Sequence, residues 1–254
     1  MGPVTTFDVK RSKQLADALP RQVAGDGSPC GACSIRHLSI CAVLRPDELS
    51  EMDAIATAVE LAPGDPLFDE EEPADYFFNV TAGTMKIYKL LADGRRQVTG
   101  FLGAGDFLGL AHEATYAYSA EAVTAASLCR FPRRKLEALL QRFPKLETRL
   151  LGVAGHELAA AQEQMVLLGR KTAREKIASF LLALERQAAR REQPDGPVNV
   201  PMSRADIGDY LGLTTETVSR TFTQLKGAGV IRLLQGGRVE LLDRAALARL
   251  AEGQ

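Results

Sequence analysis

The sequence predicts an α+β protein in which an antiparallel β-barrel is followed by a long helix and then by a winged helix-turn-helix. Short β-prone runs separated by Gly, Pro or Asp fill residues 60 to 132. Helix-forming residues dominate from residue 133 onward. Towards the C-terminus, two short helical patterns are joined by a glycine turn and followed by two more β-prone runs.

The composition is that of an ordinary globular protein. The chain has 254 residues, of which 46 % are hydrophobic and 25 % are charged. These values exclude collagen-like, coiled-coil-only and wholly disordered chains. No apolar run approaches the roughly 18 residues that a membrane span needs. Because no apolar core follows the basic residues near the N-terminus, we expect no secretory signal, no membrane partner and a cytoplasmic location.

The net charge of −1 is an average over two unequal parts. Residues 170–254 hold 14 basic and 10 acidic groups, whereas residues 1–169 hold 17 basic and 22 acidic groups. The chain as a whole therefore has no basic footprint for nucleic acid, but its C-terminal part is mildly basic.

Residues 1–45 are predicted to form an N-terminal arm that ends in a cysteine cluster. Prolines, glycines and scattered charges before residue 30 favour a mobile segment. Cys30, Cys33 and Cys41 follow, separated by two and seven residues, and Cys129 lies far along the chain. Four thiolates suit either tetrahedral zinc, with His37 as a further candidate ligand, or an iron–sulfur cluster. Alternatively, Cys129 is an ordinary buried apolar residue.

Residues 46–143 are expected to form the barrel domain. Pro46 and the acidic residues after it predict a helix start, and apolar residues continue at helical spacing to Val59. Asp93-Gly94 is a strong hairpin signal. The predicted strands are Tyr76–Val80, Met85–Leu90, Gln97–Leu102, Ser127–Phe131 and one near residues 119–125. Closely spaced short strands of this kind favour an antiparallel barrel or sandwich.

Residues 144–169 are predicted to form one long helix that starts at Pro144. Two rows of apolar residues repeat along it every seven positions. We call this stripe the seam, and its members are Leu151, Ala154, Leu158, Ala161, Met165 and Leu168. An a/d pattern over three heptads predicts that two such helices pair in a homodimer. The alternative is a helix packed on its own barrel.

Residues 170–254 are expected to form the winged helix-turn-helix domain. Ser203 and Asp206 have the spacing of a helix cap. Gly208 is small where a second helix would cross, Gly212 suits the tight turn and Val218 anchors the second helix in the core. The two β-prone runs of the wing are Val230–Leu233 and Arg238–Leu242.

The second helix of this motif is a candidate for insertion into the major groove of double-stranded DNA. Thr215, Glu216, Ser219 and Arg220 lie on its N-terminal exposed face. An arginine can bond guanine O6 and N7 in a bidentate manner, and a glutamate can accept from cytosine N4. The alternative for Glu216 and Arg220, which are four residues apart, is a surface ion pair.

The segment Gly-Asp-Tyr-Leu-Gly-Leu-Thr-Thr-Glu-Thr-Val-Ser-Arg at 208–220 resembles the CRP/FNR family of bacterial transcription regulators. The resemblance covers residues 30 to 250. It implies a barrel of the cyclic-nucleotide-binding jelly-roll kind. It also implies a contact with RNA polymerase, for which the Ala92–Arg96 hairpin is a candidate. The pattern Glu-x-x-Ser-Arg at 216–220 resembles the FNR-type subgroup, which implies palindromic TTGAT-like sites. Residues 118–121 read Tyr-Ser-Ala-Glu where the cyclic-nucleotide branch has an arginine that binds phosphate, so no cyclic nucleotide is expected.

The resemblance also implies a cofactor. FNR-type oxygen sensors hold a [4Fe–4S] cluster with three N-terminal cysteines and one in the barrel, which implies Cys30, Cys33, Cys41 and Cys129 as ligands here. The resemblance then implies a regulator that is active as a homodimer at low oxygen and activates or represses anaerobic genes. Some members have an acidic residue in the seam where this chain has Ala161, which should favour the dimer.

Two other functions compete with this one. The first is a regulator of the same family with a different sensor: zinc-stabilised, haem-binding or responsive to a small effector. The second is an iron–sulfur electron-transfer protein, which the helix-turn-helix disfavours. An enzyme is not expected, because the sequence shows no set of nucleophile and base and no cofactor loop.

Overall fold

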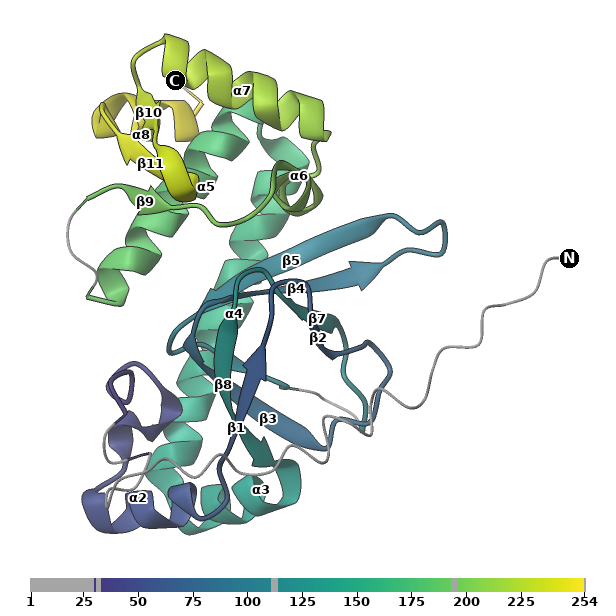
Figure 1. Ribbon diagram of the computed structural model, residues 1–254, viewed down its shortest axis with the longest axis vertical. Helices are drawn as coiled ribbons and strands as arrows, with labels where there is room; N and C mark the ends of the chain where they lie inside the picture. Colours follow the sequence, from purple (N-terminus) through teal and green to yellow (C-terminus); the bar gives the residue numbers. More distant parts are fainter. Residues whose placement is uncertain (1–29, 31–32, 111–113, 193–195, 254) are drawn as a thin grey trace, which may run out of the picture.

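The computed structural model describes residues 30, 33–110, 114–192 and 196–253 (Figure 1). The predicted mobile segment before residue 30 lies outside the described residues. The barrel domain lies between a small helical base and the C-terminal domain, and the long helix α4 connects the two ends of the molecule (Figure 1). The predicted α+β architecture is confirmed.

The barrel is built from two antiparallel four-stranded sheets, with strand orders β1-β8-β3-β6 and β2-β7-β4-β5. Apolar side chains from both sheets, among them Phe78, Val80, Met85 and Leu128, fill the space between them. The strands are β1 Thr57–Leu61, β2 Pro66–Phe68, β3 Tyr76–Ala82, β4 Thr84–Leu90, β5 Arg96–Gly103, β6 Phe107–Leu108, β7 Ser119–Ala122 and β8 Ala126–Pro132.

Gly83 joins β3 to β4 and shows why a glycine is needed there. Its φ is +83°, and a Cβ built on it would lie 2.3 Å from the carbonyl oxygen of Ala125. Only a residue without a side chain fits such a close approach of two backbones. The predicted strands and the Asp93-Gly94 hairpin between β4 and β5 are all present.

The helix predicted from Pro46 is shorter than its apolar spacing suggested. Helix α2 spans Pro46–Asp53, and Val59 lies on strand β1. The extension to Val59 was therefore wrong. Thr57–Leu61 pairs along its length with β8, and this edge pairing buries Val59 and Leu61 in the barrel, which outweighs a local helical pattern. Strands β1, β2 and β6, and strand β9 (Val198–Asn199) of the C-terminal domain, were not predicted.

Three helices follow the barrel: α3 Arg133–Arg142, α4 Pro144–Arg170 and α5 Ala173–Arg190. On α4 only Leu146 and Leu167, near its two ends, are buried. The first packs with the cysteine-bearing segment, and the second packs in the C-terminal core. Among the residues that the structure describes, none buries the apolar side chains in the middle of α4.

The C-terminal domain continues with β9 Val198–Asn199, α6 Arg204–Leu211, α7 Thr215–Gly227, β10 Ile231–Leu233, β11 Arg238–Leu241 and α8 Arg244–Ala251. The three strands form a small antiparallel sheet in the order β10-β11-β9, which is the predicted wing with one more strand. Ile207, Leu211, Val218, Phe222 and Leu225 pack α6 and α7 together. In the described part of the chain, every helix is too short or too polar to span a membrane.

Candidate DNA-binding helix, dimer seam and cysteine pocket

The helix-turn-helix is held by local interactions that its sequence specifies. Ser203 Oγ accepts a hydrogen bond from the Asp206 backbone N–H at 3.0 Å, and an Asp206 carboxylate oxygen accepts one from the Ser203 backbone N–H at 3.2 Å. Gly212 has a φ of +62° and ends α6 in the left-handed conformation. A Cβ on Gly208 would lie 2.6 Å from the Leu213 carbonyl oxygen. The two helices can therefore cross only at a glycine.

The structure places the four candidate DNA-contacting residues together on the exposed N-terminal half of α7. Thr215, Glu216, Ser219 and Arg220 are exposed, whereas Val218 on the opposite face is fully buried. In the described part of the chain, Glu216 and Arg220 do not pair, and the surface ion pairs of this domain are Arg232–Glu240 and Arg244–Glu185. Both side chains are thus available to an external ligand.

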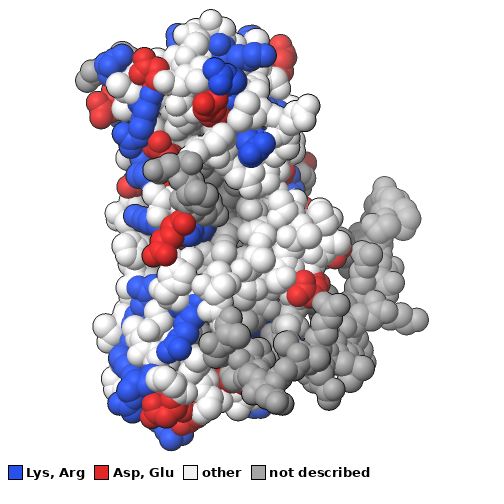
Figure 2. Space-filling view, turned by 60° about the vertical axis from the view of Figure 1, so that its left-hand side comes forward, with Lys and Arg blue, Asp and Glu red and all other residues white. Residues whose placement is uncertain are grey.

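On the face shown in Figure 2, charges of both signs are interspersed. In Figure 2, Lys and Arg side chains lie over the C-terminal domain at the top with a few acidic residues between them. The phosphate backbone of DNA would meet only a mildly basic surface here. Because phosphate contacts carry no sequence information, side chains of α7 have to discriminate between base sequences.

The seam on α4 is exposed over its central part. Leu151 is 69 % exposed, Leu158 62 % and Met165 70 %, and Ala161 between them is also exposed. Ala154 and Leu168 are half-buried, and Leu168 packs against the C-terminal core. Large apolar side chains left in solvent at regular seven-residue intervals are typical of an interaction surface. The alternative was that the seam packs on its own barrel. It is wrong for Leu151, Leu158 and Met165, which are exposed in the single chain.

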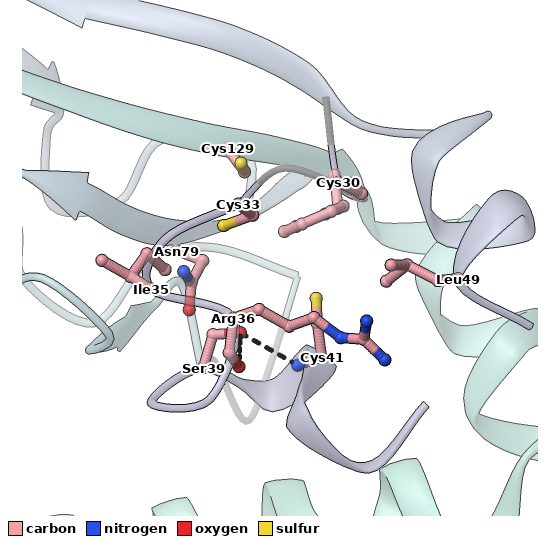
Figure 3. Close-up of a pocket in the computed structure, with 10 residues that line it drawn as sticks. Cys30, Cys33, Ile35, Arg36, Ser39, Cys41, Leu49, Asn79 and Cys129 are labelled. Carbon is pink, nitrogen blue, oxygen red and sulfur yellow. Dashed lines mark hydrogen bonds between the residues drawn. The ribbon is translucent and has the colours of Figure 1, made fainter. Parts of the chain in front are cut away.

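The four cysteines line one pocket, although they come from different parts of the chain (Figure 3). Cys30 and Cys33 lie in a turn, Cys41 lies in the short 3-10 helix Ile40–Val43 and Cys129 lies on β8. All four are free thiols. The remaining lining residues are Ile35, Arg36, Ser39, Leu49, Asn79 and Phe131.

Burial raises the pKa of three of these thiols, those of Cys30, Cys41 and Cys129. Burial is the main cause that raises the pKa of Cys129 to about 12, and the nearby Cys33 and Cys41 raise it further. Burial likewise raises the pKa of Cys30, helped by a hydrogen bond with Asp53. The pKa of Cys41 is also raised by burial, although Arg36 and a hydrogen bond from Ser39 oppose the shift. Among the described residues, no three Cys, His, Asp or Glu side chains are close enough to hold one metal ion.

Sequence reasoning missed Asn79, which lies beside Cys129. The two residues are register partners on the paired strands β3 and β8. Asn79 is almost fully buried, and within the described structure its Oδ1 has no hydrogen-bond partner. A buried polar atom without a partner lowers the stability of the fold. An asparagine at this position therefore points to a role of its side chain in the pocket. The signal in the sequence is a single amide inside the otherwise apolar run Phe77–Val80.

Known families match both halves of the chain. A Crp-like helix-turn-helix domain matches residues 175–250, and a cyclic nucleotide-binding domain matches residues 58–143. The chain is 42 % identical over 226 residues to the nitrogen fixation regulation protein FixK of Bradyrhizobium diazoefficiens, covering 89 % of this chain and 95 % of FixK. It is 39 % identical over 222 residues to the transcriptional activator protein FnrL of Cereibacter sphaeroides, covering 86 % and 90 %.

A solved structure gives the same picture. FixK2 from Bradyrhizobium japonicum superimposes with a TM-score of 0.73 and 38 % identity, over 77 % of this chain and 97 % of that one. The relatives are named as regulation and transcriptional activator proteins, and the fold and the helix-turn-helix of this chain agree with them. The chain therefore belongs to the CRP/FNR family of DNA-binding transcription regulators.

Proposed function

We propose that this protein is an oxygen-responsive transcription regulator that holds a [4Fe–4S] cluster with Cys30, Cys33, Cys41 and Cys129. The observation that carries the proposal is the convergence of all four cysteines of the chain on one pocket. Three cysteines of the N-terminal segment and one on β8 line this pocket together, as a ligand shared by all four would require.

The residues around the pocket fit such a group. Four free thiols form the donor set that iron–sulfur clusters use. Arg36 and the buried amide of Asn79 also line the pocket. Because ligands must be deprotonated, the raised pKa values of Cys30, Cys41 and Cys129 mean that metal binding releases protons. When bound, the cluster supplies an oxygen-sensitive link between the four thiolates.

The chain itself connects this pocket to the dimer helix. Cys30 and Cys41 belong to the same apolar cluster as Leu146 near the start of α4. Arg149 on α4 donates a hydrogen bond to the carbonyl oxygen of Leu38 at 3.1 Å. An ordered cysteine segment therefore braces the first turns of α4, and release of the segment removes these contacts. Such an order–disorder change is a known kind of switch.

The DNA target follows from a symmetric assembly. Two copies joined through the seam present two recognition helices to successive major grooves of a TTGAT-type palindrome. Bound there at low oxygen, the dimer activates or represses anaerobic genes, and the hairpin at Ala92–Arg96 contacts RNA polymerase. The name of the similar FnrL protein, a transcriptional activator, supports activation.

The sensor is tested by anaerobic purification. We expect a brown protein with about four iron and four sulfide per chain, which loses its colour and its binding to TTGAT palindromes in air. Cys129→Ser should lose iron and DNA binding together. Ser127→Ala is the matched control on the same strand, since the hydroxyl of Ser127 bonds Glu60 outside the pocket.

Two outcomes would contradict this function. A colourless protein that contains zinc would show a structural metal site in place of the cluster. A brown protein that leaves every TTGAT-type palindrome unprotected in anaerobic footprinting would favour electron transfer.

The seam residue Ala161 gives a second prediction. Ala161→Asp should weaken the cluster-free dimer, because it places two like charges across the helix pair. In the wild-type protein an alanine there favours pairing, so oxygen acts less through dissociation and more through reorientation of helices. Sedimentation of the apo-protein measures the change, with Ala160→Asp as an exposed control outside the seam. Unchanged sedimentation of Ala161→Asp would contradict this role.

A further inference from the structure

Lys86 on β4 is a buried cation that joins the barrel to the helix-turn-helix. Its Nζ lies 2.7 Å from a carboxylate oxygen of Glu121 on β7 and 2.9 Å from one of Asp206 on α6. Only 6 % of its side chain is exposed. The neighbours of Lys86 and Glu121 on β4 and β7 point into the barrel core; they are Met85, Ala120 and Ala122. The ion pair therefore lies on the outer face of this sheet, toward α6.

Arg96 on β5 forms the second bridge to α6. Its Nη2 donates to Asp206 at 2.9 Å, and its Nε donates to Asp209 at 3.0 Å. A guanidinium can hold two carboxylates at once because its donors form a rigid fork. We call Lys86, Arg96, Glu121, Asp206 and Asp209 the interdomain network. Figure 1 shows the β4–β5 hairpin lying directly beneath α6.

Asp206 has two roles that meet at the start of α6. One carboxylate oxygen caps the helix through Ser203, and the other accepts from Lys86 and Arg96. Burial alone would raise the pKa of Asp206, but Ser203, Lys86 and Arg96 together lower it, so the carboxylate stays charged. The same side chain thus fixes both the local geometry of α6 and its position on the barrel.

The other contacts across this junction are both polar and apolar. Gln97 on β5 donates to the carbonyl oxygen of Asp209 at 2.7 Å. Phe101 on β5 lies 5.2 Å from the ring of Tyr210 and 6.2 Å from that of Phe180, measured between ring centroids. Apolar contacts provide attraction with little directionality. Partly buried ion pairs add little net stability, but they can impose one relative orientation on the two domains. Any other orientation would leave a buried charge without its partner.

We propose that Lys86 and Arg96 are positioning residues for DNA recognition, because they fix α6 at one orientation to the barrel. Helix α7 is tied to α6 because the turn between them packs closely on Gly208. In the homodimer proposed above, on which this inference rests, the two barrels are joined through α4. The interdomain network then sets the distance and the angle between the two recognition helices, and so the spacing of half-sites that the dimer accepts.

The spacing of half-sites is a sensitive probe of this orientation. One base pair more or less between them moves a half-site by roughly 3.4 Å and turns it by roughly 34° about the DNA axis. A recognition unit that is held at one orientation cannot follow such a change, whereas one that has lost the ion pairs of the network is held by fewer directional contacts and can reorient.

The experiment measures anaerobic binding to duplexes whose TTGAT half-sites are separated by the optimal spacer or by one base pair more or fewer. We expect the wild-type protein to lose about tenfold or more in affinity when the spacer changes. Arg96→Ala should bind the optimal duplex less tightly and lose only about threefold or less when the spacer changes. Arg96→Lys keeps the charge but lacks the forked guanidinium. When the spacer changes, its loss of affinity should lie between those of the wild-type protein and Arg96→Ala.

Lys89→Ala is the matched control. Lys89 lies on the same strand as Lys86 and pairs with Glu70 at 2.6 Å, but both partners belong to the barrel. Its spacer profile should equal that of the wild-type protein. Asp209→Asn, at a carboxylate that is one-third exposed, repeats the test without removing a buried group.

A wild-type spacer profile in Arg96→Ala or in Asp209→Asn, with a normal thermal melt, would overturn the positioning role. A wild-type protein that prefers no spacer would overturn it as well. A wild-type protein that sediments as a monomer would instead overturn the homodimer on which the inference rests. The two failures are therefore distinguishable.

Discussion

Leu158→Asp is expected to leave the protein monomeric and to lower its affinity for a palindrome by roughly 10²–10⁴-fold, the gain that two linked binding sites normally provide. The Leu158 side chain lies in the middle of the seam and is 62 % exposed in the single chain. Burial of a leucine is worth about 1.5–3 kcal/mol, and the dimer contains this residue twice. A carboxylate in its place would also have to lose its hydration.

Sedimentation and DNA binding should be measured together for this variant. His156→Asp is the control, because His156 is exposed on the same helix and lies on the side opposite the seam. Binding to a single half-site should remain weak and equal in both variants. A Leu158→Asp protein that still sediments as a dimer would contradict the assignment of the seam.

Arg220→Ala is expected to lose sequence-specific binding. A bidentate arginine–guanine contact is worth about 1–3 kcal/mol of discrimination, and the dimer makes it in both half-sites. The affinity for the palindrome should therefore fall roughly 30-fold or more, since every 1.4 kcal/mol is a factor of ten. The exposed position of Arg220 on the N-terminal half of α7, without a partner in the described chain, supports this role.

The control for Arg220→Ala is Lys226→Ala, which removes the same charge from the C-terminal part of α7. Loss of a general electrostatic contact should weaken binding to every sequence alike and reduce the salt dependence. Competition with a duplex altered at one base pair separates the two effects. If Arg220→Ala discriminates against that duplex as well as the wild-type protein does, Arg220 does not read a base.

The local features of the C-terminal domain could be predicted because short-range chemistry determines them. The cap at Ser203, the left-handed turn at Gly212 and the small residue at Gly208 each reflect a steric or hydrogen-bonding need within a few residues. The seven-residue period of the seam could also be recognised in the sequence, because residues at this spacing lie on one face of an α-helix. These residues were sufficient to indicate the family.

The barrel was predicted less completely. Residues 55–59 follow a helical apolar spacing, yet Thr57–Leu61 forms a strand because pairing with β8 buries its alternate side chains. The two-residue strands β6 and β9 have no periodicity to detect. Such short segments become strands only because a neighbour supplies the hydrogen bonds, and that neighbour is distant in the sequence.

The candidate sites were likewise predicted only in part. By itself the sequence determined which residue types are present: four cysteines at suggestive spacing, a recognition helix and a seam. Only the tertiary structure decided that Cys129 faces the pocket beside Asn79, and that Lys86 and Arg96 reach Asp206 across two domains. The physical reason is that strand register and domain packing bring together groups far apart along the chain, and no local pattern encodes such a meeting.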